Sequence, residues 1–589
     1  MRAHGSDKRR LAVVAAALLA GAGVVHAETV ELRGAWVWGR TCADEAAADK
    51  MLRRAASMNL NALYVLVFYD GATAYHRSDL VATSGHVAEG FDPLGHLVRE
   101  GAKRGIEIHA WFVNGPIRRL TEARVLREHP DWQAVDLAGR KVDWYDLCNP
   151  AVRAWQARLM VELAGRYAVR GVHFDYIRFN GMGLSASAAA RRAAARDGID
   201  VDALCYAKLP AYGAFHGNPL AEPTTARVLA MFHGGVPAIA VNRLGRGEVF
   251  LLNWHAHQNP PRAVHRAVGA ILKRLGAAPG GGVGVLDTDL TGEGRYSHRR
   301  YADAAAWITS LGYRPKRLRD RDLGTPPAGL AIVLPQHYCM TEPQARALVA
   351  HVRGGGGAVF LDGPVYAVRD GQAARTLLGF RRMGRYFKGE RVLSAAAAGK
   401  DLAGLVPAGG RELTVEAERD KLRAWNRWRK DQVTRLVADV RRQVKKLRRD
   451  CLVTAAVFRT RDSADRVAQD WPRWLREGLV DYAIPMSYVA TAAELKEHFA
   501  WWKTFDPKLE RTIPAVGAFR IGVDLPPADR AARIAEQIDC CRRQGARGFV
   551  MFVLAKIDDE TAAALGRTAL KGKARPYAPG QQGGRRPLR

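Results

Sequence analysis

The segment Gly171-Val-His-Phe-Asp-Tyr-Ile-Arg-Phe179 decides the fold of this chain, because it has the pattern of a buried strand that ends in charged residues. Its apolar residues are β-branched or aromatic, as in a strand of a parallel sheet. Asp175 and Arg178 follow one another closely, and such residues are costly to bury unless they stabilise each other or a polar ligand. The segment predicts a strand with a polar site at its C-terminal end. A structural Asp–Arg pair is the alternative.

Seven further apolar runs have a similar length and composition. They lie at 32–38, 62–69, 107–113, 452–458, 482–488, 512–519 and 548–554. Helical patterns separate them, at 44–58, 93–104, 150–169, 425–448, 467–477, 493–502 and 528–544. Eight strands alternating with helices predict an α/β fold of the (β/α)8, or TIM-barrel, type. An open doubly wound sheet is the alternative, but no Gly-rich phosphate loop follows the first run.

One connection is far longer than the others, since about 270 residues separate the fourth run from the fifth. A loop of that length contains a domain of its own. Strand-like runs at 238–241, 248–253, 283–287, 330–334 and 358–361 alternate there with helical patterns at 262–275, 299–311 and 342–352. We therefore expect a smaller Rossmann-like or flavodoxin-like α/β domain at 215–410. It interrupts the barrel after strand four, between barrel halves at 28–210 and 411–565.

Both ends of the chain differ from this pattern. Lys8, Arg9 and Arg10 precede an apolar stretch at 11–25, and Val25-His26-Ala27 has the small residues that signal peptidase requires. We expect a signal peptide at 1–27 and an exported bacterial protein, periplasmic, secreted or on the cell surface. A retained anchor is the alternative, although the stretch is shorter than the roughly 20 residues of a spanning helix. The basic segment 570–589 is predicted to be a disordered tail.

The amino-acid composition indicates which binding partners, metals and cofactors to expect. The formal net charge is +31, which favours acidic polymers such as nucleic acid, anionic glycans or a charged cell wall. We find no nucleic-acid-binding motif, and an Arg-rich source proteome is the alternative explanation. None of the 7 cysteines forms a CxxC pair or has zinc-ligand spacing, so a disulfide scaffold or zinc site is not indicated. His255 and His257 form an HxH pair without nearby carboxylates. No metal or cofactor is expected.

Five sequence blocks carry a family resemblance. They are Arg33-Gly-Ala-Trp-Val-Trp38, Asp146-Leu-Cys-Asn-Pro150, Asp175-Tyr-Ile-Arg-Phe179, Gln469-Asp-Trp471 with Gly478-Leu-Val-Asp-Tyr482, and Ile484-Pro-Met-Ser-Tyr488. In this order they resemble the bacterial glycosyl-hydrolase-like family ten, over roughly 31–180 and 420–560. The resemblance implies a barrel that hydrolyses glycosidic bonds of cell-wall or extracellular polysaccharide, with Asp175 as the acidic residue of strand four. Many relatives have a second acidic residue where this chain has Tyr176.

Glycoside hydrolysis normally needs two carboxyl groups, one to protonate the leaving oxygen and one to attack or to activate water. Asp175 is the first candidate. Asp70 after strand two and Asp146 before the fourth crossover helix are the candidate catalytic partners, and Asp462 and Asp470 follow strand five. Helix capping is the alternative role for Asp146 and for Asp470.

Flat rings stack on sugars, and polar groups at strand ends orient them. The candidate substrate-binding residues are Trp36, Trp38, His109, Trp111, Asn114, His173, Tyr176, Arg178 and Tyr488. Core packing is the alternative for each ring, and a satisfied structural role is the alternative for each histidine.

The predicted insert has a resemblance of its own. Val283-Gly-Val-Leu-Asp287, Ile332-Val-Leu-Pro-Gln336 and Gly356-Gly-Ala-Val-Phe-Leu-Asp-Gly363 resemble the glutamine-amidotransferase-like fold found beside sugar-cleaving barrels. No cysteine occupies the sharp elbow that an active amidotransferase requires, so we expect a non-catalytic domain that shapes the cleft or forms an oligomer interface. A non-catalytic carbohydrate-binding or scaffold protein on a degenerate barrel is the alternative function for the whole chain.

Overall fold

The computed structural model describes residues 29–121, 123–137, 139–181, 183–202, 204, 215–217, 220–232, 236–252, 262–288, 297–335, 341–361, 372–383, 387–389, 393–395 and 415–579. The chain divides into two compact units. The first comprises residues up to Glu128, Arg153–Phe179 and the part from Val433 onward, and the second comprises His129–Val152 and Asn180–Gln432. The predicted signal peptide, His255 and His257 lie outside the described residues.

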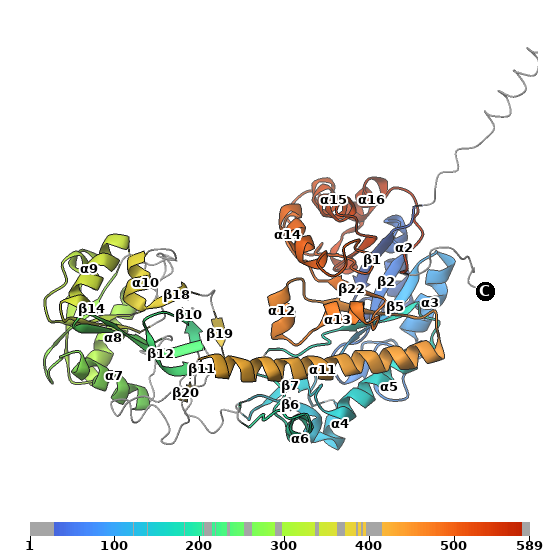
Figure 1. Ribbon diagram of the computed structural model, residues 1–589. Coiled ribbons are helices and arrows are strands. Elements are labelled where there is room, and N and C mark those ends of the chain that lie inside the picture. Colours follow the sequence, from blue (N-terminus) through green and yellow to red (C-terminus); the bar gives the residue numbers. More distant parts are fainter. Residues whose placement is uncertain are drawn as a thin grey trace, which may run out of the picture. The chain divides into compact units, whose positions relative to one another are not determined.

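The first unit contains a parallel barrel (Figure 1). In chain order its strands are β1 (Leu32–Val37), β2 (Ala62–Phe68), β5 (Glu107–Val113), β8 (Gly171–Asp175), β21 (Leu452–Val457), β22 (Tyr482–Pro485), β23 (Ala515–Val516) and β24 (Gly548–Met551). Neighbouring strands in this order pair in parallel, except β22 and β23, and β24 pairs with β1. A parallel bridge between Ala483 and Thr512 lies at the remaining seam. The predicted TIM barrel is confirmed, with all eight strands in the predicted segments.

Helices follow most of the barrel strands. They are α2 (Glu45–Ser57), α3 (Pro93–Lys103), α5 (Pro150–Arg166), α14 (Ala492–Trp502), α15 (Pro527–Arg543) and α16 (Asp559–Arg567), and α11 (Val415–Leu447) precedes β21. Asp44 caps α2 by accepting the N–H of Ala47, and Asp92 caps α3 by accepting that of Gly95. The helix predicted at 467–477 is wrong in its extent. Only 471–476 of that segment is helical, as α13 (Trp471–Arg476), whose first turn begins at Trp471-Pro472, and a separate short helix, α12 (Arg461–Arg466), precedes the predicted segment.

Large side chains fill the barrel. Trp36, Tyr64, Trp111 and Tyr482 are almost completely buried in one apolar cluster with aliphatic residues from the neighbouring strands. The Tyr64 and Tyr482 hydroxyls bond across the interior at 2.6 Å, so each buried O–H has a partner. The interior is therefore packed, and a ligand can reach the polar groups only at the ends of the strands.

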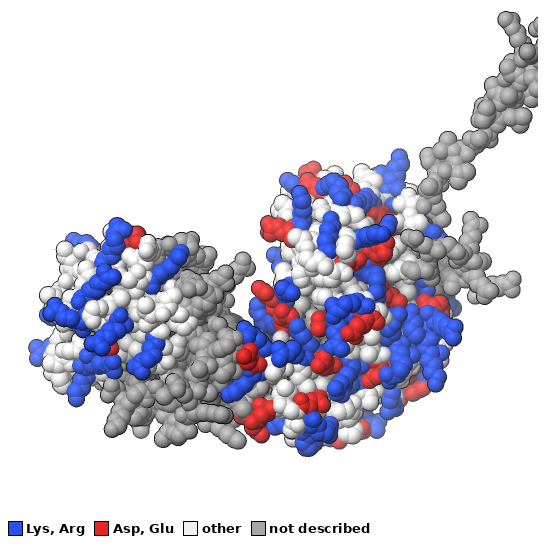
Figure 2. All heavy atoms as spheres, in the orientation of Figure 1, with Lys and Arg blue, Asp and Glu red and all other residues white. Residues whose placement is uncertain are grey.

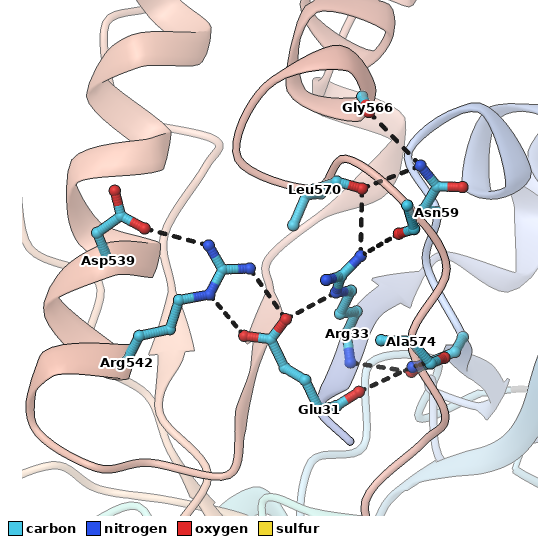
Figure 3. Close-up of polar contacts among 10 residues, drawn as sticks. Glu31, Arg33, Asn59, Asp539, Arg542, Gly566, Leu570 and Ala574 are labelled. Carbon is cyan, nitrogen blue, oxygen red and sulfur yellow. Dashed lines mark hydrogen bonds and ion pairs between the residues drawn. The ribbon is translucent and has the colours of Figure 1, made fainter. Parts of the chain in front are cut away.

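A polar network lies where β1 begins (Figure 3). Glu31 accepts hydrogen bonds from Arg33 at 2.7 Å and from Arg542 of α15 at 2.7 Å. Arg33 also donates to the carbonyl oxygens of Leu570 and Gly572, and Leu570 is fully buried. The predicted disordered tail at 570–589 is thus wrong for 570–579, because this segment supplies acceptors to buried donors at the N-terminal end of the barrel. Residues 580–589 lie outside the described part of the chain.

The second unit contains an eight-stranded sheet in the order β15-β14-β16-β17-β13-β12-β11-β20. Its strands are β11 (Arg227–Phe232), β12 (Val236–Leu244), β13 (Gly247–Leu252), β14 (Gly282–Leu286), β15 (Arg314–Leu318), β16 (Ala331–Leu334), β17 (Gly357–Phe360) and β20 (Leu393–Ala395). Its helices include α7 (Arg262–Arg274), α8 (Ser297–Ser310), α9 (Glu342–Arg353) and α10 (Gln372–Leu378). Buried apolar clusters cover both faces of the sheet. Among the described residues, no helix has the length and apolarity needed to cross a membrane.

Candidate active site

Asp175 is the last residue of β8, where strand side chains meet the mouth of a barrel. It is only 5% exposed. Its Oδ1 accepts the backbone N–H of Tyr176 at 2.7 Å, and its Oδ2 accepts the indole N–H of Trp111 at 3.0 Å. Burial raises the pKa of Asp175 to about 6, against the opposing effects of Arg178 and of these two hydrogen bonds. The carboxyl group is therefore partly protonated near neutral pH, as a general acid must be.

The chain turns sharply after Asp175. Tyr176 has a φ of 50°, in the left-handed region that non-glycine residues seldom occupy, and its carbonyl accepts the N–H of Arg178. The guanidinium of Arg178 lies 4.3 Å from the ring centre of Tyr176 and 4.8 Å from that of Phe458. Strain of this kind persists only where the surroundings impose it. The turn therefore places a carboxyl, a phenol and a buried cation at one strand end.

Aromatic rings surround this end of the barrel. Trp38 packs against Trp111 at 5.3 Å between ring centres and against Tyr69 at 5.7 Å. Phe552, which follows β24, lies 5.7 Å from Trp38 and 5.0 Å from Tyr488. Trp38, Tyr69, Tyr176, Tyr488 and Phe552 are only partly buried, whereas Trp36 and Trp111 belong to the packed core. The partly buried rings offer faces and edges on which a sugar could pack.

The two candidate histidines are buried in the barrel interior. His173 accepts the indole N–H of Trp36 at 3.2 Å, and its other nitrogen bonds to Thr454 at 2.8 Å. The His109 ring stacks on the Tyr64 ring, with 4.6 Å between the ring centres. Burial lowers the pKa of both rings, so both are neutral. Their contacts are those of core residues.

Asn114 follows β5 and is completely buried. Its backbone N–H donates to the carbonyl of Asp175, its side-chain amide donates to the Gln156 side chain of α5, and its backbone carbonyl accepts from the Gln156 amide. Asn114 therefore fixes the end of β5 against β8. Its backbone hydrogen bond to the carbonyl of Asp175 thereby helps to hold Asp175 in place.

Asp70 makes a tight turn after β2. Its Oδ1 accepts the N–H groups of Ala72 and Thr73 at 2.8 Å each, and its Oδ2 accepts the Thr73 hydroxyl at 2.8 Å. The guanidinium of Arg119 lies 3.4 Å from the same oxygen. These contacts occupy both oxygens with local partners, as in a structural Asx turn.

Asp146 belongs to the second unit and is completely buried. Its carboxylate accepts hydrogen bonds from the N–H of Cys148 and from the hydroxyls of Ser185 and Ser187. Asn149, not Asp146, accepts the N–H of Ala151 at the start of α5. The structure thus places Asp146 as an anchor between two loops.

The remaining candidate acids lie elsewhere. Asp462 is exposed in the first turn of α12. Asp470 occupies the residue before α13 but makes no capping bond with its side chain. In the part of the chain that the structure describes, the groups that bond to Asp175 or act on its charge include no second carboxylate.

Sequence reasoning missed two residues of the site. Phe552 follows the eighth strand, so the strand-end rule that selected the other rings could have found it. Arg118 lies in the loop after β5, is exposed, and has its guanidinium 4.4 Å from the ring centre of Tyr69. It also lowers the pKa of Asp175 by its charge. No sequence pattern marks a loop residue of this kind.

Comparison with known proteins finds a family model and curated relatives that match the barrel segments of this chain. Residues 31–198 and 408–522 match the family model described as Glycosyl hydrolase-like 10. Glycosyl hydrolase DigH of Escherichia coli (strain K12) is 32% identical over 140 residues, which are 20% of this chain and 31% of that protein. Glycosyl hydrolase YngK of Bacillus subtilis (strain 168) is 29% identical over 139 residues, or 21% and 26% of the two chains. The alignments thus span less than a third of these curated relatives.

Among solved structures, the glycoside hydrolase domain of PgaB (BpsB) from Bordetella bronchiseptica is similar with a TM-score of 0.45 and 11% identity, covering 92% of this chain and 100% of that one. A score at this level carries no argument about function. The barrel itself is established by the strand order and register of this chain.

Proposed function

Residues 31–198 and 408–522 of this chain match the family model of glycosyl hydrolase-like 10, and from that match we propose that the chain hydrolyses glycosidic bonds with Asp175 as the catalytic acid. The observation that carries the proposal is the Asp175 carboxyl, buried at the end of strand four with a pKa of about 6. A carboxyl with this pKa can hold a proton near neutral pH and give it to the leaving glycosidic oxygen.

The surroundings of Asp175 suit a sugar polymer. Trp38, Tyr488 and Phe552 are partly buried rings at the mouth, and rings of this kind pack on the apolar faces of sugars. We propose a polysaccharide of the bacterial cell wall or extracellular matrix as the substrate. We further propose that the enzyme is exported by the segment 1–27. N-terminal sequencing of the exported protein is then expected to begin at Glu28, and an unprocessed N-terminus would contradict cleavage there.

A non-catalytic carbohydrate-binding barrel is the second candidate function. Two points favour it: the family resemblance implies a second acidic residue where this chain has Tyr176, and no second carboxylate bonds to Asp175 or acts on its charge among the described residues. A protein of this kind would bind glycans through the same rings without releasing sugars.

The substitution Asp175→Asn separates the two functions. It removes the acid but keeps the size of the side chain and its ability to accept the Trp111 hydrogen bond. We expect release of reducing ends from cell-wall polysaccharide to fall by a factor of about 10² to 10⁴, the usual contribution of a general acid. The melting temperature should stay within a few degrees.

A matched control is Glu536→Gln, which makes the same carboxyl-to-amide change on the exposed face of α15. It is expected to keep full activity. Undiminished sugar release by Asp175→Asn would contradict the assignment of Asp175. Glycan binding by the wild-type protein without any sugar release would favour the carbohydrate-binding function.

A further inference from the structure

Arg118 lies at the mouth of the barrel with its side chain exposed. It comes five residues after the end of β5, and its guanidinium packs 4.4 Å from the ring centre of Tyr69, which directly follows β2. A guanidinium stacked on an aromatic face keeps its N–H edges free to bond in its own plane. The stacking therefore holds the planar group and leaves its donors directed away from the ring.

Asp70 fixes the backbone beneath Arg118. The carbonyl of Asp70 accepts the N–H of Arg118 at 2.7 Å and that of Arg119 at 3.2 Å. The Asp70 carboxylate lies close to the Arg119 side chain, at 3.4 Å. Asp70 thus ties the loop after β5 to the turn after β2. Its carboxylate pairs with Arg119, and Arg118 is held by its backbone and by Tyr69.

The charges at the mouth are mostly positive. Arg178 is buried beside Tyr176, and Arg520 donates to the carbonyl of Tyr488 at 3.1 Å. Arg118 acts electrostatically on Asp175 and on Tyr176, so it lies near the proposed acid. Within the described ranges, no carboxylate forms an ion pair with Arg118. A substrate carboxylate near Asp175 would therefore meet a cation that no acidic side chain of the described residues neutralises.

We propose that Arg118 binds the carboxylate of an acidic sugar in the polysaccharide substrate, close to the glycosidic oxygen that Asp175 would protonate. The inference rests on the proposed function and names the chemical class of the substrate. The planar fork of an arginine matches a carboxylate with two parallel N–H···O bonds, and stacking on Tyr69 orders the fork before the substrate arrives. Specificity would follow because a neutral sugar leaves this cation without a partner.

An oligosaccharide-binding experiment tests the proposed role of Arg118 without relying on hydrolysis of the substrate. The probes are immobilised uronic-acid oligosaccharides and the same oligosaccharides after reduction of their carboxyl groups, presented to the Asp175→Asn protein. We expect at least tenfold tighter binding to the carboxylated probes, and a smaller difference as salt rises. Adding Arg118→Ala should abolish the difference, and Arg118→Lys should restore part of it. Arg53→Ala, which removes an exposed arginine from α2, is the matched control and should keep it.

The outcomes separate this inference from the proposed function. Equal binding of the two kinds of probe, binding of neither, or a preference that survives Arg118→Ala overturns the role of Arg118. A preference that depends on Arg118, in a wild-type protein that releases no sugar from any polysaccharide, supports the carboxylate site and contradicts the hydrolase. Sugar release that is the same before and after carboxyl reduction supports the hydrolase and contradicts the carboxylate site.

Discussion

At the scale of single residues, the hydrogen bond from Trp111 to Asp175 sets the working pH. The indole N–H stabilises the ionised carboxylate and so lowers its pKa from the value that burial alone would give. Trp111→Phe removes this bond, and the pKa of Asp175 should rise above about 6. The protonated acid then persists to higher pH. We expect the alkaline limb of the pH–rate profile to move up by roughly one pH unit, since a bond to a charged group contributes about 1.5 kcal/mol.

Trp36→Phe is the control for this change. It removes an indole N–H from the same barrel, but that group donates to His173 and has no bond to Asp175. Its pH profile should keep the wild-type midpoint even if the protein is less stable. Identical midpoints in the two variants would show that Trp111 does not act on the acid through its hydrogen bond.

The sequence predicts the position of Asp175 because the strand rule is local: a buried run that ends in a charged residue brings that residue to the mouth. The strand rule does not reveal which other polar side chains already have hydrogen-bond partners within the fold. Asp146 bonds to Ser185 and Ser187, about forty positions away along the chain, and His173 bonds to Thr454 in another strand. Contacts between residues so far apart depend on the assembled fold, and no local pattern encodes them.

At the scale of elements, the eight barrel strands could be predicted because strands buried on both faces are continuous apolar runs. Strand β15 of the second unit could not, since its sequence Arg314-Pro-Lys-Arg-Leu318 is mostly basic. It lies at the edge of its sheet, where charged side chains can face solvent and block pairing with other chains. The boundary of β8 was also predicted too far along, at Phe179, because the turn at Tyr176 requires a positive φ that the apolar pattern does not indicate.

Gly548 allows β24 to approach β1. A Cβ at this position would lie 2.2 Å from the carbonyl oxygen of Leu32 and 2.6 Å from its Cβ, and Gly548 has a φ of 155°. Gly548→Ala should therefore force the two strands apart and cost about 3 kcal/mol. We expect a loss of several degrees in the melting temperature or insoluble protein. Gly105→Ala serves as a comparison, because it is strained by its φ of 70° but has open space around it. An unchanged melting temperature for Gly548→Ala would contradict this packing at the β1–β24 seam.

At the scale of the whole molecule, the positive charge is widely distributed. Lys and Arg side chains are spread over the visible face of both units, with acidic groups among them on the barrel unit (Figure 2). A spread of this kind is a solvated surface more than a focused binding groove. We therefore attribute the proposed preference for acidic sugars to Arg118 in particular, and not to the overall charge of this face.

The network around Glu31 predicts how the stability of the barrel unit depends on pH (Figure 3). Burial raises the pKa of Glu31, but hydrogen bonds from Arg542 and Arg33 outweigh burial, and the pKa lies below its usual range. A lowered folded-state pKa contributes stability that is present above the unfolded-state pKa and is lost as pH falls through the folded value. Glu31→Gln should cost about 3 kcal/mol at pH 7. Thermal melts should show the gap from wild type closing below about pH 4, and a gap independent of pH would contradict the linkage.

Residues near the two ends of the described chain, Thr29 to Glu31 and Leu570 to Arg575, contact each other at the N-terminal end of the barrel. These contacts predict how truncated proteins behave. The N–H of Arg575 donates to the carbonyl of Thr29 at 2.8 Å, and the N–H of Glu31 donates back to Arg575 at 3.0 Å. Asn61 donates to the carbonyl of Ala574, and Leu570 is fully buried. Removing 570–589 would leave an empty space where the buried Leu570 packs and would leave buried donors without acceptors. The free energy of unfolding should fall by at least about 3 kcal/mol.

Removing 580–589 is the matched truncation, since it leaves every one of these contacts in place. We expect it to melt like the full chain, while the longer truncation melts roughly 6–10 °C lower. The longer truncation should also weaken the pH dependence that Glu31 provides, because Arg33 would lose the carbonyls of Leu570 and Gly572 that hold it beside Glu31, while Arg542 would keep its bonds to Glu31. Equal melting temperatures for the two truncated proteins would mean that 570–579 adds nothing to the barrel, and that the network around Glu31 is complete without it.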